Sequence, residues 1–174
     1  MMFIYSIDVE GLDEQIDLLE AEPQLSRREL SQAMKRSVAV IERNVQPFVP
    51  VDRGRLRSSI GSEVTEISDL SIVGRVGSSL RDEVYPKVME LGREPGTYPN
   101  MTALAAWVRR VILRGETDEG KIARLTFLIG RSIMLRGIKP REYLKQGWEK
   151  SIDRVKDFFS EALENIANGL SNRR

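Results

Sequence analysis

Two long runs of apolar residues at helical spacing, one in each half of the 174-residue chain, constrain its fold more than any other sequence feature. In the first, within residues 26–45, a large apolar side chain recurs at steps of three or four, which places these side chains on one helix face. They are Leu30, Met34, Val38, Ile41 and Val45. Ser26 and Glu29 make a capping-box pattern at the start of this helix. Pro47 and Pro50 favour its end.

The second run predicts a long helix from about Tyr143 to Leu170. Its apolar residues are Trp148, Ile152, Val155, Phe159, Leu163, Ile166 and Leu170. Acidic side chains follow another side of the same helix at steps of four, and we interpret this side as a polar surface in solvent. These residues are Glu149, Asp153, Asp157 and Glu161.

Residues 51–80, between the two helices, change to strand character. Arg55 to Ile67 and Leu70 to Ser79 predict two strands, and the break at Ser68 and Asp69 favours a hairpin. The expected fold class is therefore α+β, with long helices packed on a small antiparallel β-hairpin sheet.

Shorter elements complete the expected architecture. They are a strand within Met2–Val9, a weak acidic helix from Leu12 to Ala21, a short helix or strand from Tyr85 to Leu91, a helix capped by Asn100 or Thr102, and a helix from Lys121 to Leu135. The last of these is apolar on much of its circumference, which predicts that it is well buried.

The composition excludes several kinds of chemistry. The chain has no Cys and no His, so it has no disulfide, no Ser-His or Cys-His catalytic pair, and no sulfur or imidazole metal ligand. Glu116, Asp118 and Glu119 share a loop but lack the ligand spacing of a calcium loop, so we interpret that loop as solvated. We predict no enzyme activity, no cofactor and no metal. The apolar stretch Leu125–Leu135 is interrupted by Arg131 and predicts no membrane span.

Charge is unevenly distributed, although Lys plus Arg (27) nearly balances Asp plus Glu (26). Residues 1–24 contain seven acidic and no basic residues. Residues 25–57 contain eight basic and three acidic residues, and residues 109–145 contain ten basic and four acidic ones. Two interpretations are open: ordinary solvated faces, or complementary contacts between subunits of an assembly.

Three arginines alternate in the first basic stretch. Arg53, Arg55 and Arg57 would share one face of a strand and form a candidate interface for phosphate or for a partner's carboxylates. The stretch lacks the interleaved aromatic residues of a single-strand nucleic-acid platform. A nucleic-acid-binding module that uses these basic strand and helix faces is the alternative function.

The run QPFVPVDRGRLRSSI at residues 46–60 resembles the signature of the tail-completion, or head–tail joining, proteins of long-tailed bacteriophages. The matching positions are Pro50, Val51, Asp52, Gly54, Leu56, Arg57 and Ser59. Two later parts of the resemblance are a Tyr followed by Glu-x-Gly, and a Gly-x-x-Pro-Arg-x-aromatic-Leu motif. They place Tyr85, Glu90, Gly92, Gly137, Pro140, Arg141, Tyr143 and Leu144 in the family pattern.

The resemblance implies a structural protein of the virion. It implies one α+β domain over residues 25–170 with a helical insertion at about 98–137, preceded by an acidic segment at residues 1–24. Proteins of this kind form a homo-oligomeric ring at the neck, a minor tail component between the head connector or adaptor and the tail terminator or tail tube. DNA would then meet the protein only while passing through the ring, no membrane would be involved, and the protein would wait in the host cytoplasm before assembly.

Overall fold

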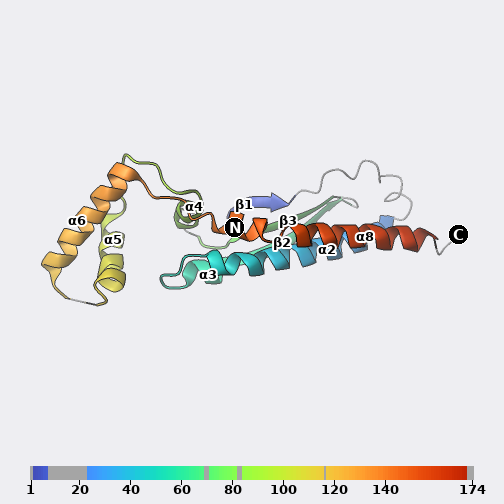
Figure 1. Ribbon diagram of the computed structural model, residues 1–174, viewed down its shortest axis with the longest axis horizontal. Coiled ribbons are helices and arrows are strands. Elements are labelled where there is room, and N and C mark those ends of the chain that lie inside the picture. Colours follow the sequence, from blue (N-terminus) through green and yellow to red (C-terminus); the bar gives the residue numbers. More distant parts are fainter. Residues whose placement is uncertain (1, 8–22, 69–70, 82–83, 116, 172–174) are drawn as a thin grey trace. The chain divides into compact units, whose positions relative to one another are not determined.

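The computed structural model describes residues 2–7, 23–68, 71–81, 84–115 and 117–171 (Figure 1). The predicted α+β class is confirmed, because long helices accompany a small antiparallel sheet. The chain divides into a first compact unit, Met1–Pro86 with Glu142–Arg174, and a second one, Lys87–Arg141. Each unit is described by itself.

Helix α2 (Pro23–Val45) is the centre of the first unit. All five apolar residues predicted for its stripe are buried: Leu30, Met34, Val38, Ile41 and Val45. The capping-box prediction was wrong, because the helix begins at Pro23 and both Ser26 and Glu29 are buried inside it. Proline is well suited to this first turn, where a backbone N–H has no helical partner. Helix α2 ends at Val45, as Pro47 and Pro50 predicted, and the short helix η2 (Gln46–Phe48) follows it.

Helix α8 (Ile152–Ser171) lies beside α2 and runs antiparallel to it (Figure 1, red and blue). Asn165 Nδ2 donates to Glu29 Oε2 over 3.2 Å near one end of the pair. Asn44 Nδ2 donates to Ser151 Oγ over 2.9 Å near the other end. The apolar contacts between the two helices comprise two clusters, whose buried members are Leu30, Ala33, Phe158, Ala162 and Ile166.

The single helix predicted from Tyr143 to Leu170 is instead two helices. Helix α7 (Tyr143–Glu149) ends before α8 begins. At the break, Ser151 Oγ donates to the Gly147 carbonyl over 2.6 Å, and the Ser151 backbone N–H bonds the Trp148 carbonyl over 2.8 Å. The serine hydroxyl thus takes the carbonyl that its own N–H would bond in a continuous helix. The acidic residues predicted to lie in solvent are exposed, as expected: Glu149, Asp153, Asp157 and Glu161.

The sheet of the first unit has the strand order β1-β3-β2, with all pairs antiparallel. Its strands are β1 (Met2–Ile7), β2 (Ile60–Ser68) and β3 (Ser71–Ser78), so the hairpin and the N-terminal strand are both confirmed. The predicted acidic helix at residues 12–21 lies outside the described residues. Strand β3 lies against α2 at Gly74, where an added Cβ would be 2.5 Å from Met34 Sδ and 2.6 Å from Val38 Cγ1. Glycine therefore allows this close approach.

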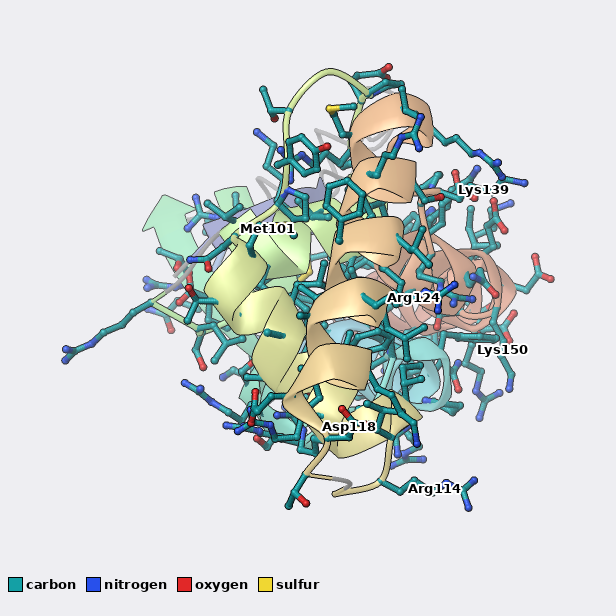
Figure 2. The ribbon with its side chains drawn as sticks, turned by 90° about the vertical axis from the view of Figure 1, so that its left-hand side faces the viewer. Met101, Arg114, Asp118, Arg124, Lys139 and Lys150 are labelled. Atoms are coloured by element: carbon teal, nitrogen blue, oxygen red, sulfur yellow. The ribbon has the colours of Figure 1, made fainter. Side chains whose placement is uncertain are left out.

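The second unit is a small helical unit. Helix α4 (Val84–Leu91) leads into it, and α5 (Met101–Trp107), η3 (Val108–Ile112) and α6 (Glu119–Arg136) follow. Figure 2 shows α5 and α6 side by side. Asn100 caps α5 as predicted, its side chain accepting a hydrogen bond from the Ala103 N–H. Among the described residues, no helix combines the length and the apolar character that a membrane crossing requires.

Candidate interaction surfaces

The motif at residues 50–59 forms a tight turn followed by a single helical turn. Gly54 has φ +74° and begins helix α3 (Arg55–Ser59), in which the Ser58 N–H bonds the Gly54 carbonyl over 2.8 Å. Leu56 is buried, with 2% of its surface exposed. The strand predicted to begin at Arg55 begins only at Ile60. The cause is Gly54, whose left-handed conformation turns the chain into α3 before it extends.

Ser59 joins this turn to the sheet. Its hydroxyl donates to the Leu56 carbonyl over 2.7 Å and lies 2.8 Å from the hydroxyl of Ser78. The Ser59 carbonyl accepts from the Ser79 N–H over 2.8 Å. Both Ser59 and Ser78 are buried. These bonds connect the start of β2 to the end of β3, so the motif serine has a structural role.

The sequence predicts that the three arginines of the candidate interface share one face of a strand. The structure shows that they do not. Arg53 lies in the turn, and Arg55 and Arg57 lie on α3. All three are exposed, and Arg57 NH2 donates to the Val49 carbonyl over 3.3 Å. The predicted shared face is therefore wrong, because residues two apart on a helix point in different directions. An interface role for these arginines stays a prediction.

Three further motif residues, Tyr85, Tyr143 and Leu144, also belong to the first unit. The Asp52 carboxylate interacts with the Tyr85 phenol closely enough to act on its pKa. Burial, and secondarily the negative charge of Asp52, raise the pKa of Tyr85 above 10.0, because both disfavour the phenolate. Tyr143 is fully buried at the start of α7, and its hydroxyl donates to the Pro86 carbonyl over 3.4 Å. Leu144 beside it is also buried.

The remaining motif residues gather where the chain enters and leaves the second unit. Arg93 and Ile138 form an antiparallel bridge, with N–H to carbonyl distances of 2.9 and 2.8 Å. Gly92, with φ +77°, leaves no room for a Cβ, which would lie 2.5 Å from the Ile138 carbonyl oxygen and 2.9 Å from the Pro140 nitrogen. Gly137, with φ +73°, is crowded in the same way by the Arg93 carbonyl. Each glycine thus allows the backbone on the other side of the bridge to approach closely.

Helix α4 adds a further backbone contact beside the bridge between Arg93 and Ile138. The Arg141 N–H donates to the Met89 carbonyl over 2.9 Å, which extends the bridge by one contact. Glu90, the acid of the Glu-x-Gly motif, is fully buried, whereas Pro140 and Arg141 are exposed. Burying a carboxyl group costs free energy unless hydrogen bonds or charges compensate for the lost water. The base of the second unit is therefore held by backbone contacts between two distant stretches of the sequence.

The burial predicted for the helix at residues 121–135 was wrong on one side. Ile122, Thr126 and Gly130 of α6 are buried, and Gly130 lies against Met101 of α5. Phe127, Leu128 and Leu135 on the opposite side are 52%, 49% and 57% exposed. The apolar pattern predicted a helix enclosed on most sides, but within the second unit α5 covers only one of them. An apolar surface of this kind on a small unit marks a candidate interaction site.

The acidic residues are the candidate metal ligands in the described part of the chain. There, no group of three or more Asp and Glu side chains is placed to hold a metal ion. Asp118 of the acidic loop caps α6 instead, its carboxylate accepting from the Lys121 N–H over 3.1 Å. Its neighbour Glu119 pairs with Arg109 at 2.5 Å on the exposed surface.

Comparison with known families adds a finding that is independent of these surfaces. Residues 13–98, about half of the chain, match the model of the HK97-gp10-like family, described as "Bacteriophage HK97-gp10, putative tail-component". Through these residues the chain belongs to the HK97-gp10-like family. No curated protein and no solved structure matches the chain.

Membership in the HK97-gp10-like family makes the protein a bacteriophage tail component and hence a part of the virion. The matched residues include the turn motif at residues 50–59 and the Tyr85, Glu90 and Gly92 motif. The second motif group, which begins at Gly137, lies outside the match. Most of the second unit also lies beyond residue 98 and hence outside the match.

Proposed function

We propose that this tail component acts at the neck of a long-tailed bacteriophage, where it completes the tail and joins it to the head as a non-enzymatic ring of identical subunits. The family match at residues 13–98 is the observation that carries the proposal. It is supported by the part that the motif residues play in the structure. They form a turn, a hydrogen-bonded serine pair and a backbone bridge, which are elements of a scaffold.

The proposed domain arrangement follows the resemblance and the contact pattern. Residues 25–170 form the α+β domain, with a helical insertion at about 98–137, and the acidic segment 1–24 precedes it. The bridge between Arg93 and Ile138 supports this arrangement, because it closes the chain on both sides of the insertion. An element closed at its base can vary or be added without disturbing the strands and helices of the first unit.

The proposed partners are other copies of the chain, the head connector or adaptor on one side, and the tail terminator or tail tube on the other. A ring requires a heterologous contact, in which two different surfaces of each subunit meet. The uneven charge of the sequence, acidic in residues 1–24 and basic in other stretches such as residues 109–145, supports a contact of this kind. The protein would collect in the host cytoplasm before it joins the virion.

A nonsense mutation in the phage gene tests this proposal. We place the stop codon at Tyr143, which removes α7 and α8, and examine lysates from non-suppressing hosts by electron microscopy. The proposal predicts filled heads and separate, complete-length tails, with infectious particles restored when purified protein is added. Joined particles with normal infectivity would contradict it.

Purified protein also separates this proposal from the nucleic-acid alternative. A binding module that uses Arg53, Arg55 and Arg57 would retain DNA with an affinity that falls steeply with salt. A neck protein is expected to show weak DNA binding that is unchanged when these arginines are replaced by glutamine. Tight binding that these substitutions abolish would favour the alternative.

A further inference from the structure

The exposed side of α6 combines apolar and basic side chains. Five residues at steps of one, three or four form what is here named the α6 stripe: Arg124, Phe127, Leu128, Arg131 and Leu135. At 3.6 residues per turn these positions lie within about a third of the helix circumference. Figure 2 shows Arg124 projecting from α6 away from α5.

The charge of this side has one sign. Residues 120–141 contain six basic residues and no acidic one. Arg124 and Arg131 are exposed, and neither has an ion-pair partner in the part of the chain that the structure describes. Two such stripes placed face to face would therefore oppose like charges, which disfavours a symmetric contact between α6 helices. A matching partner must present apolar side chains flanked by carboxylates.

The chain itself contains a segment of that chemistry. Residues 10–22, EGLDEQIDLLEAE, contain six acidic and no basic residues. Within them Leu12, Ile16 and Leu19 are spaced by four and three positions, which is the spacing of one helix face. This segment lies outside the described residues, so the match between the two surfaces rests on its sequence.

We propose that the α6 stripe binds the acidic segment 10–22 of a second copy of this chain. Apolar residues of the segment would cover Phe127, Leu128 and Leu135, while its carboxylates would pair with Arg124 and Arg131. The contact joins two different surfaces, so it repeats from copy to copy. The inference rests on the proposed function in one respect, because it specifies the contact through which the proposed ring closes.

A second basic surface exists but suits the segment less well. A groove of about 350 Å³ on α2 is lined by Gln24, Arg27, Arg28, Ser31, Gln32 and Lys35. It offers positive charge to the carboxylates, but all of its side chains are polar. It therefore offers no large apolar side chain to pack against Leu12, Ile16 and Leu19. The α6 stripe matches both properties of the segment.

Charge reversal in the full-length protein tests the contact. The stripe variant carries Arg124→Glu and Arg131→Glu, and the segment variant carries Asp17→Arg and Glu20→Arg. Light scattering after size exclusion, over a range of concentrations, measures self-association. Each variant is expected to associate at least about tenfold more weakly than the wild type. Combining all four substitutions in one chain, or mixing the two variants in equal amounts, is expected to restore association.

A matched control separates this contact from a general effect of charge. Arg27→Glu with Lys35→Glu makes the same change in net charge on the α2 groove and is expected to leave association unchanged. Equal losses in the control and the stripe variant would overturn the inference, as would the absence of rescue in the combined chain.

The remaining outcomes distinguish the inference from the proposed function. If the wild type forms a ring and the stripe variant forms it equally well, the inference fails while the proposed function stands. If the wild type is monomeric at every concentration, both the self-association and the inference fail. If the two variants change only the protease sensitivity of residues 10–22 and not the mass, the segment binds within its own copy, which overturns the inference.

Discussion

Gly137→Ala is expected to destabilise the second unit because glycine is required there for two separate reasons. Gly137 has φ +73° and ψ −161°, a conformation that is essentially confined to glycine and costs about 1–3 kcal/mol for other residues. The Arg93 carbonyl also occupies the position of an added Cβ. Because this neighbour is backbone held in the bridge, crowding adds about 1–3 kcal/mol. We expect a total loss of about 2–6 kcal/mol.

Gly115→Ala is the matched control. Gly115 also has positive φ, at +92°, but an added Cβ would meet nothing within 4 Å. This variant is expected to lose only the backbone contribution of about 1–2 kcal/mol. Crowding at the bridge therefore predicts a larger loss of stability for Gly137→Ala than for Gly115→Ala.

The two tryptophans allow each unit to be followed separately. Trp107 lies on α5 in the second unit, and Trp148 lies on α7 in the first. In a Trp148→Phe background, urea denaturation followed by fluorescence reports on the second unit alone. Gly137→Ala should lower the urea midpoint well below that of Gly115→Ala. Equal midpoints for the two variants would refute the argument that backbone contact closes the base of this unit.

Three more substitutions test the first unit. Gly147→Ala would place a Cβ 2.7 Å from Val45 Cα and 2.8 Å from its nitrogen, so urea denaturation should show a loss of about 1–3 kcal/mol. Ser59→Ala removes a buried hydroxyl bond and should cost about 1–2 kcal/mol by the same measurement. Asp52→Asn should lower the pKa of Tyr85, measured by ultraviolet absorbance, while leaving it above 10.0, because burial is the larger cause.

Each of these predictions has an outcome that contradicts it. For Gly147, Gly61→Ala is the control, because nothing lies within 4 Å of its added Cβ, and equal stabilities would rule out close helix packing. For Ser59, an unchanged midpoint would mean that the serine pair adds no stability. For Tyr85, the raised pKa implies stability that is fully present below pH 10 and decreases as pH rises through the folded-state pKa. Stability that increases there would contradict the assigned shift.

Helix α2 was predictable because a single local pattern determines it. Five apolar positions at helical spacing are sufficient to identify the face that is buried, and all five are buried in the structure. The N-terminal boundary was predicted less accurately, because Ser26 and Glu29 make a capping-box pattern in sequence but both lie buried within the helix. Local spacing thus predicts which face is buried better than it predicts where the element begins.

The missed features depend on interactions that local spacing does not contain. Helix α3 replaces the predicted strand because Gly54 adopts positive φ, and Ser59 then bonds across to Ser78. The break before α8 depends on the hydroxyl of Ser151 and its partner Asn44, which is distant in sequence. Neither serine stands out in a hydrophobicity pattern.

The candidate surfaces also combine features that the sequence predicts with features that only the structure reveals. The uneven distribution of charge, which suggested contacts between copies, can be seen in the sequence alone. The exposure of Phe127 on α6 is not, because an apolar helix is expected to be buried unless the neighbouring elements are too few to cover it. Only the structure shows that α5 covers one side and leaves the other in solvent.

The location of the protein in the virion tests the central claim most directly. A short epitope appended after Arg174 and labelled with gold-conjugated antibody would reveal that location in electron micrographs of intact phage. A protein that joins the tail to the head is expected to give label at the junction between head and tail. Label spread along the tail tube or confined to the distal tip would contradict it.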